Sequence, residues 1–149
     1  MTIRKATYSE TQTILNYSLV VLKEATMGSV EQSQEKALQL VSPFLSDGGF
    51  YLVHIENNVI QGWIGVGKIF DYYTDEMVGF IPEIFVLPQY RKQGIAEKLC
   101  MEAFSKLKEH GYQKVQLNVF SGNPVKNLYY KLGFNDVSTL MQKDLDLSP

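Results

Sequence analysis

The sequence predicts a mixed α/β fold whose first strands are antiparallel. Alternating apolar runs separated by short turns fill the middle of the chain, as in an antiparallel meander. A long amphipathic helical pattern follows, after which helix and strand patterns alternate. With 149 residues, 45% of them hydrophobic and 20% charged, the chain has the size and composition of one globular domain covering residues 1–149.

Charge and composition argue against several classes of protein. A net charge of −2 does not suit a protein that mainly holds nucleic-acid phosphates. The single cysteine, Cys100, cannot form an intrachain disulfide, and no cysteine cluster indicates a zinc site. No apolar run approaches the ~18 residues that span a bilayer. We therefore expect a soluble cytoplasmic protein with no metal, nucleic-acid or membrane partner; a homodimer is compatible with this composition.

The first elements are a strand and two helices. Residues Thr2–Thr7 alternate as a short strand. The capping-box spacing of Ser9–Gln12 predicts a helix that continues through Glu24, with apolar residues at helical intervals. The same spacing at Ser29–Gln32 predicts a second helix, for which Pro43 indicates an irregular end.

Three strands are predicted next. Residues Phe50–Ile55 and Val59–Phe70 form a hairpin pattern around the turn Asn57-Asn58. The polar loop 71–76 separates this hairpin from a third strand over Met77–Leu87.

The second half alternates helix and strand. Residues Ile95–His110 carry the clearest amphipathic pattern, and Gly111 follows at the expected left-handed cap position. We then expect a strand over Lys114–Phe120, a short helix over Pro124–Leu132 and a final strand over Phe134–Lys143.

A candidate anion site lies where the third strand of the meander meets the long helix. Free N–H groups at a helix start, reinforced by the helix dipole, attract anions. Gly94 opens the helix without a β-carbon, and Arg91 and Lys92 add positive charge. Neither a Walker loop nor a dinucleotide fingerprint fits, because Gly94 is the only glycine here. The alternative is a plain glycine turn with two solvated bases.

Two motifs around this loop resemble the signatures of the GNAT family of N-acetyltransferases. Arg91–Ala96, which reads Arg-Lys-Gln-Gly-Ile-Ala, resembles the family's Arg/Gln-x-x-Gly-x-Gly/Ala signature. Asn123-Pro124 followed by Leu128–Phe134 resembles its second signature, Asn…Leu-Tyr-x-Lys-x-Gly-Phe. Either motif alone is weak, but the two in order, with one predicted strand between them, are a specific signal.

The resemblance implies a fold and a co-substrate. The fold would be a twisted mixed sheet of six to seven strands with about four helices, in which the strands ending near Leu87 and starting near Lys114 splay apart. Acetyl-CoA would lie in that gap. Its pantetheine would pair with Phe85, Val86 and Leu87, and Asn123 would hold it or cap a helix. Its pyrophosphate would lie against Arg91, Lys92, Gln93, Gly94, Ile95 and Ala96.

The resemblance also implies direct acetyl transfer to a primary amine. An ammonium titrates near ~10.4 and a thiol near ~8.5, so both ends of the reaction need proton transfer at neutral pH. Tyr129 matches the family's proton donor. The spacing from Asn123 is one residue short, so Tyr130 is the alternative. Glu83 is the candidate base, against a solvated or salt-bridged carboxylate, and Cys100 is expected in the core.

The acceptor is the part of the expected reaction that the sequence determines least. The loop over residues 70–76 has three carboxylates and two tyrosines, which suit a cationic amine, although an ordinary polar hairpin loop has the same composition. A polyamine, an aminoglycoside, an amino acid and a protein N-terminus all fit. Two other functions stay open: a non-catalytic acyl-CoA-binding regulatory domain, and an acyltransferase that uses a longer acyl-CoA.

Overall fold

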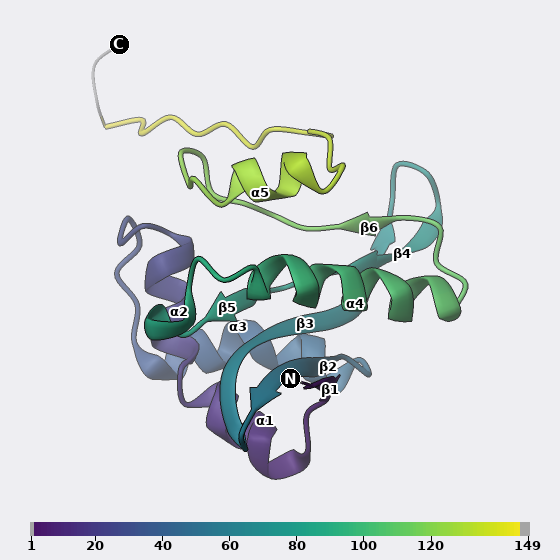
Figure 1. Cartoon of the computed structure of the whole chain (residues 1–149). Coiled ribbons are helices and arrows are strands. Elements are labelled where there is room, and N and C mark those ends of the chain that lie inside the picture. Colours follow the sequence, from purple (N-terminus) through teal and green to yellow (C-terminus); the bar gives the residue numbers. More distant parts are fainter. Residues whose placement is uncertain (1, 147–149) are drawn as a thin grey trace.

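A computed structural model describes residues 2–146 of the chain, so both ends of the expected 1–149 domain, residue 1 and residues 147–149, lie outside it. In the described part, six strands form a sheet in the order β1-β2-β3-β4-β6, with β5 beside β3 (Figure 1). The strands are β1 Thr2–Lys5, β2 Phe50–Glu56, β3 Val59–Asp71, β4 Glu76–Phe80, β5 Ile84–Val86 and β6 Val115–Gln116. The helices are α1 Tyr8–Leu15, α2 Ser18–Ala25, α3 Gln34–Ser46, α4 Ile95–Glu109 and α5 Lys126–Lys131, with a 3₁₀ turn at Pro88–Tyr90.

The predicted mixed α/β class is confirmed. Every strand pair is antiparallel except β4 with β6, which is parallel. The expected hairpin turn is also present, since Asn57 and Asn58 have φ angles of 52° and 62°. No helix within residues 2–146 is long and apolar enough to cross a membrane.

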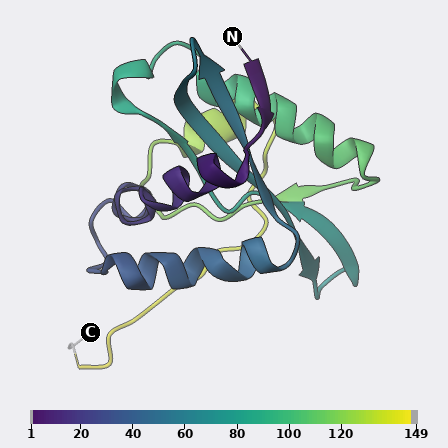
Figure 2. The ribbon, with the colours of Figure 1, turned by 90° about the horizontal axis from the view of Figure 1, so that it is seen from below.

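Side-chain alternation along the strands builds a core on each face of the sheet. Figure 2 shows the helices on both faces of the sheet. Leu52 and Ile64 pack against α4, which contributes a buried row that includes Leu99. Their neighbours Tyr51 and Trp63 face the opposite side and pack with residues of α1 and α2. The long helix and the first helices therefore cover opposite faces, and the strands between them hold the site.

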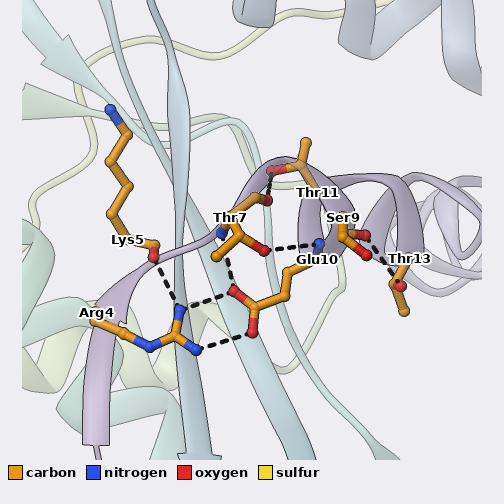
Figure 3. Close-up of polar contacts among 7 residues, drawn as sticks. All are labelled: Arg4, Lys5, Thr7, Ser9, Glu10, Thr11 and Thr13. Carbon is orange, nitrogen blue, oxygen red and sulfur yellow. Dashed lines mark hydrogen bonds and ion pairs between the residues drawn. The ribbon is translucent and has the colours of Figure 1, made fainter.

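The first helix starts earlier than predicted. Its N-cap is Thr7, whose side chain accepts from the N–H of Glu10 at 3.2 Å, while Glu10 accepts from the N–H of Thr7 at 2.8 Å (Figure 3). Arg4 donates to both carboxylate oxygens of Glu10 at 2.8 and 3.0 Å and lowers the pKa of Glu10 to about 2. The prediction of a cap at Ser9 with Gln12 was wrong because an ionised Glu, held by Arg4, is the better acceptor at the third position.

The single helix predicted through Glu24 is also wrong, because the chain breaks between α1 and α2. Tyr17 makes a tight turn there, with its N–H donating to the carbonyl of Ile14 at 2.9 Å. This turn points the Tyr17 ring into the core, with centroids 5.4 Å from Trp63 and 6.4 Å from Phe85. Packing of one aromatic ring thus outweighs continuation of the helix.

The helix α3 is capped by Ser33, whose side chain accepts from the N–H of Lys36 at 3.1 Å. The predicted cap Ser29 instead donates to the carbonyl of Thr26 at 2.6 Å and closes the turn after α2. Pro43 lies inside α3, which continues to Ser46.

The strand predicted over 77–87 is two strands, separated at Ile81–Glu83. Pro82 has no N–H to donate to the ladder. Gly65 of β3 lies opposite, where a β-carbon would be 2.7 Å from Cγ of Pro82. Pairing resumes when the N–H of Gly65 donates to the carbonyl of Glu83 at 2.9 Å. The interruption presents Glu83 beside the cavity described below.

The end of the chain departs most from prediction. β6 covers only Val115–Gln116 of the expected 114–120 strand, because the chain then diverges from β5. The strand predicted over Phe134–Lys143 is absent: residues 134–144 have no strand assignment and follow a stretched path outside α5 (Figure 1). Asp136 binds Lys126 at 3.2 Å and the hydroxyl of Tyr130 at 2.7 Å, which holds this path against α5.

Candidate active site

A cavity of about 840 Å³ opens where β5 and residues 117–120 part. Its walls come from α2, α3, β5, the start of α4 and the start of α5. The carbonyl of Glu83 and the N–H of Leu87 pair with β3. Because backbone groups alternate along an antiparallel strand, those of Ile84 and Val86 face the gap. The expected splayed pair is therefore present, and its inner edge can pair with a ligand that carries amides.

The N-terminus of α4 opens into the same cavity. Gly94 is its N-cap at φ 81°, and a β-carbon there would meet nothing within 4 Å. Lys92 also has a left-handed backbone, at φ 64°. Within the described residues, no backbone hydrogen bond uses the N–H groups of Lys92, Gln93 or Gly94. These groups and the first N–H groups of α4 suit an anion.

Arg91 is more constrained than its sequence context indicates. Its Nε donates to the carbonyl of Val86 at 2.7 Å, and its Nη1 lies 2.6 Å from a carboxylate oxygen of Glu24 at the end of α2. The guanidinium also lies over the ring of Phe85, 5.1 Å from the centroid. Arg91 therefore joins α2 and β5 at the cavity mouth although its side chain is 38% exposed, and Lys92 and Gln93 are exposed as well.

Glu83 is neither salt-bridged nor freely solvated. Its two carboxylate oxygens accept from the hydroxyl of Tyr51 at 3.2 Å and from Nε1 of Trp63 at 3.0 Å. Burial raises the pKa of Glu83, and these hydrogen bonds only partly oppose it. Neither Tyr51 nor Trp63 was predicted from the sequence as a residue of the site. The alternation of side chains along the two strands could have indicated them, because it places both on the same face of the sheet.

The structure separates the two candidate tyrosines. Tyr129 lines the cavity and is 7% exposed, and its hydroxyl has no hydrogen-bond partner within residues 2–146. Burial, with a smaller effect of Cys100, raises the pKa of Tyr129 to about 12, so the phenol stays protonated. Tyr130 is 46% exposed, donates to Asp136 and does not line the cavity. Cys100 is fully buried in the core, as expected.

Asn123 lines the cavity, and its side chain forms two hydrogen bonds to different parts of the cavity wall. Its Oδ1 accepts from the N–H of Val125 at 3.0 Å, just before α5, and its Nδ2 donates to the carbonyl of Ala25 at 3.1 Å. The N-cap of α5 is Val125, without a side-chain cap hydrogen bond, so Asn123 does not cap the helix as expected. It closes the turn ahead of α5, and its amide ties that turn to the end of α2.

The loop over residues 70–76, expected to attract the acceptor, does not line the cavity and lies at the far end of the sheet (Figure 1). Asp71 accepts from the N–H of Tyr73 and from Nε2 of Gln116, and Glu76 pairs with Lys114 at 2.7 Å. Two of its three carboxylates thus fix the hairpin. No group of three His, Cys, Asp or Glu side chains that could hold a metal is present in the described range.

Comparison with known proteins identifies the class. Residues 17–134 match the acetyltransferase (GNAT) family, so the chain belongs to that family, as the motifs predicted. A [ribosomal protein bS18]-alanine N-acetyltransferase of Haemophilus influenzae is 35% identical over 83 residues, 56% of this chain and 53% of that protein. An N-alpha-acetyltransferase of Sulfurisphaera tokodaii is 31% identical over 102 residues, 63% of this chain and 60% of that protein. The chain thus spans little more than half the length of these relatives.

Solved structures show the same fold. A putative acetyl transferase from Pyrococcus furiosus has a TM-score of 0.85 at 21% identity, with 97% of this chain and 99% of that one covered. A predicted acetyltransferase from Clostridium acetobutylicum, solved with acetyl-CoA, has a TM-score of 0.74 at 20% identity, with 97% and 96% covered.

Proposed function

We propose that the protein is an N-acetyltransferase that moves the acetyl group of acetyl-CoA directly to a primary amine. The cavity between β5 and residues 117–120 is the observation that carries the proposal. It connects the open N-terminus of α4 with the buried hydroxyl of Tyr129. A co-substrate with an anionic pyrophosphate at one end and a thioester at the other needs both features.

The residues of the cavity fit acetyl-CoA, which supplies an activated acetyl thioester. The backbone groups of Ile84 and the N–H of Val86 face the gap and would pair with the pantetheine amides, whereas the Val86 carbonyl already accepts from Arg91, and the expected partners Phe85 and Leu87 pair with β3 instead. The free N–H groups from Lys92 to Ala96 would bind the pyrophosphate, with Gly94 permitting close approach. Arg91 would place its positive charge beside that anion.

Tyr129 would protonate the leaving thiolate. A general acid must hold its proton until charge develops, and burial of the Tyr129 phenol raises its pKa to about 12. Its hydroxyl is free of other partners in the described chain, so it can donate into the cavity. Tyr130 is directed to Asp136 and would serve only to hold the chain after α5.

Glu83 would accept a proton from the ammonium of the acceptor, directly or through a water, so that the neutral amine can attack the thioester. The hydrogen bonds from Tyr51 and Trp63 fix its orientation, and burial makes it a stronger base than an ordinary glutamate. The cavity wall around Glu83 is mainly apolar and includes Val21 and Val41.

The acceptor class that the relatives favour is the α-amino group of a protein, because both curated relatives carry N-terminal or alanine acetyltransferase names. Aminoglycosides are the second candidate, since an aminoglycoside N-acetyltransferase solved with CoA shares the fold at a TM-score of 0.69. Thiol release from acetyl-CoA should be measured with peptides of different N-termini, an aminoglycoside, a polyamine and free amino acids. We expect release with an N-terminal peptide. CoA binding without release for any amine would support the regulatory alternative, and faster release from succinyl-CoA the longer-acyl alternative.

The phosphate site is tested by Gly94→Val, with Gly111→Val as its matched control. Both glycines have left-handed backbones, at φ 81° and 88°, both have open space around a β-carbon, and they flank the two ends of α4. Each substitution should cost about 1–2 kcal/mol of stability for its backbone. We expect only Gly94→Val to weaken CoA binding, by about tenfold or more in calorimetry. Equal CoA affinity in the two variants would place the pyrophosphate elsewhere.

The proton donor is tested by the neighbouring pair Tyr129→Phe and Tyr130→Phe. We expect Tyr129→Phe to lower turnover about 10²–10⁴-fold with little change in CoA affinity, because the hydroxyl acts when charge develops on sulfur. Tyr130→Phe should keep its turnover. Full activity of the double variant would refute the tyrosine acid, and the reverse pattern would assign it to Tyr130.

The base is tested by the pH profile of Glu83→Gln, with Glu76→Gln, which lies outside the cavity, as control. If Glu83 accepts the proton, kcat/KM of the parent rises with pH as this carboxyl ionises, and the variant lacks that limb. With an N-terminal peptide as acceptor, the deficit of the variant should shrink as the pH rises past ~8, where the α-amino group is already neutral. A constant deficit at every pH would assign Glu83 a structural role.

A further inference from the structure

The part of the cavity around Glu83 has an apolar wall that two helices supply. These helices, α2 and α3, lie on the sheet face opposite α4 (Figure 2). Val21 of α2 packs with Tyr51 and Trp63, which bond to Glu83, and Val41 of α3 packs against the same cluster. An acceptor whose amine reaches Glu83 therefore brings its neighbouring atoms against apolar surface.

The rim of the cavity carries three large apolar side chains that are exposed. Leu40, Met27 and Phe120 line the cavity and are 54%, 47% and 47% exposed. A β-carbon at Gly122 would lie 3.8 Å from Cε of Met27, so the Met27 side chain extends from the end of α2 to the turn after Phe120. Exposed apolar side chains at the entrance of a cavity are typical of a surface that binds apolar groups of a ligand.

The cavity offers little negative charge to a cationic acceptor. Among the described residues, the carboxylates that line it are those of Glu24, Glu83 and Glu97. The Glu24 carboxylate lies 2.6 Å from Nη1 of Arg91, and that of Glu97 lies 3.4 Å from Nζ of Lys131. Glu83 accepts two hydrogen bonds but forms no ion pair within the described chain. One carboxylate is thus left to neutralise one ammonium group.

Apolar surface and a single unpaired carboxylate separate the candidate acceptors. An aminoglycoside or a polyamine carries several ammonium groups, and each group beyond the first would lie against the apolar wall without a partner. A peptide N-terminus carries one ammonium group, which Glu83 can receive. An extended peptide advances about 3.3–3.6 Å per residue, so its second side chain lies nearer the rim than its first.

We propose that the acceptor is a peptide N-terminus with an apolar second residue, and that Leu40, Met27 and Phe120 contact this second side chain at the rim. The proposal rests on the proposed function, because it takes Glu83 as the group that receives the amine. Binding would remove apolar surface of both molecules from water, which stabilises the complex. A charged second residue would lose water at the same place without gaining a partner, so the rim selects against it.

The first test compares two tetrapeptides that differ only in the second residue, leucine in one and lysine in the other. We expect thiol release from acetyl-CoA with a kcat/KM about tenfold or more higher for the leucine peptide. Leu40→Asp should reverse this order, because its carboxylate would attract the lysine ammonium and repel no charge on the parent rim. Equal kcat/KM values in the parent, or faster release with a polyamine than with the leucine peptide, would overturn the proposal.

Leu38→Asp is the matched control for Leu40→Asp. Leu38 lies on the same helix and is 37% exposed, but it does not line the cavity. The control adds the same charge to the same helix, so we expect it to keep the preference of the parent for the leucine peptide. Reversal of the order by Leu38→Asp as well would assign the effect to overall charge and overturn the contact with Leu40.

The second test measures binding without turnover. Each tetrapeptide is titrated by calorimetry into the protein saturated with CoA. We expect the leucine peptide to bind about tenfold more tightly than the lysine peptide to the parent and to Leu38→Asp, with the order reversed in Leu40→Asp. Equal affinity, or binding of neither peptide, would overturn the proposal. Preferential binding of the leucine peptide without thiol release would support the peptide site and contradict the transfer activity, so the two proposals can fail separately.

Discussion

The site depends on the point where the parallel pairing of β4 with β6 stops. Gly79 pairs with Val115 and Phe80 with Gln116, and beyond these pairs the two segments diverge around the cavity. Pro82 interrupts the strand on one side of this point, and Gly65 makes room for it on β3. The interrupted pairing leaves the backbone groups of Ile84 and the N–H of Val86 facing the gap, where they form a candidate binding edge. The interruption of strand pairing thus leaves the space that forms the cavity.

The sequence predicted the fold class and the glycine that starts α4 because both follow from local patterns. The loop before α4 was identified from the order strand, proline, glycine and helix, and the structure places Gly94 at the helix start with a left-handed backbone. The row that contains Leu99 and Cys100 was visible from helical periodicity, and it packs against the sheet. These features depend only on the spacing of residues that lie close together in the sequence.

What could not be predicted depends on contacts between distant residues. Arg4 selects Thr7 over Ser9 as the helix cap by holding Glu10, and the Tyr17 ring breaks a helix to reach Trp63. The hydrogen bonds of Tyr51 and Trp63 to Glu83 join residues 32 and 20 positions apart. The strand predicted over Phe134–Lys143 has no strand partner within residues 2–146, and periodicity alone cannot show whether such a partner exists.

Two neighbouring residues at the end of α2 connect this helix to opposite sides of the cavity. Glu24 pairs with Arg91 beside the anion site, and the carbonyl of Ala25 accepts from Asn123 at the start of α5. One helix terminus is therefore fastened to both walls of the cavity. A displacement of the end of α2 would therefore disturb both contacts, and with them both walls of the cavity, at once.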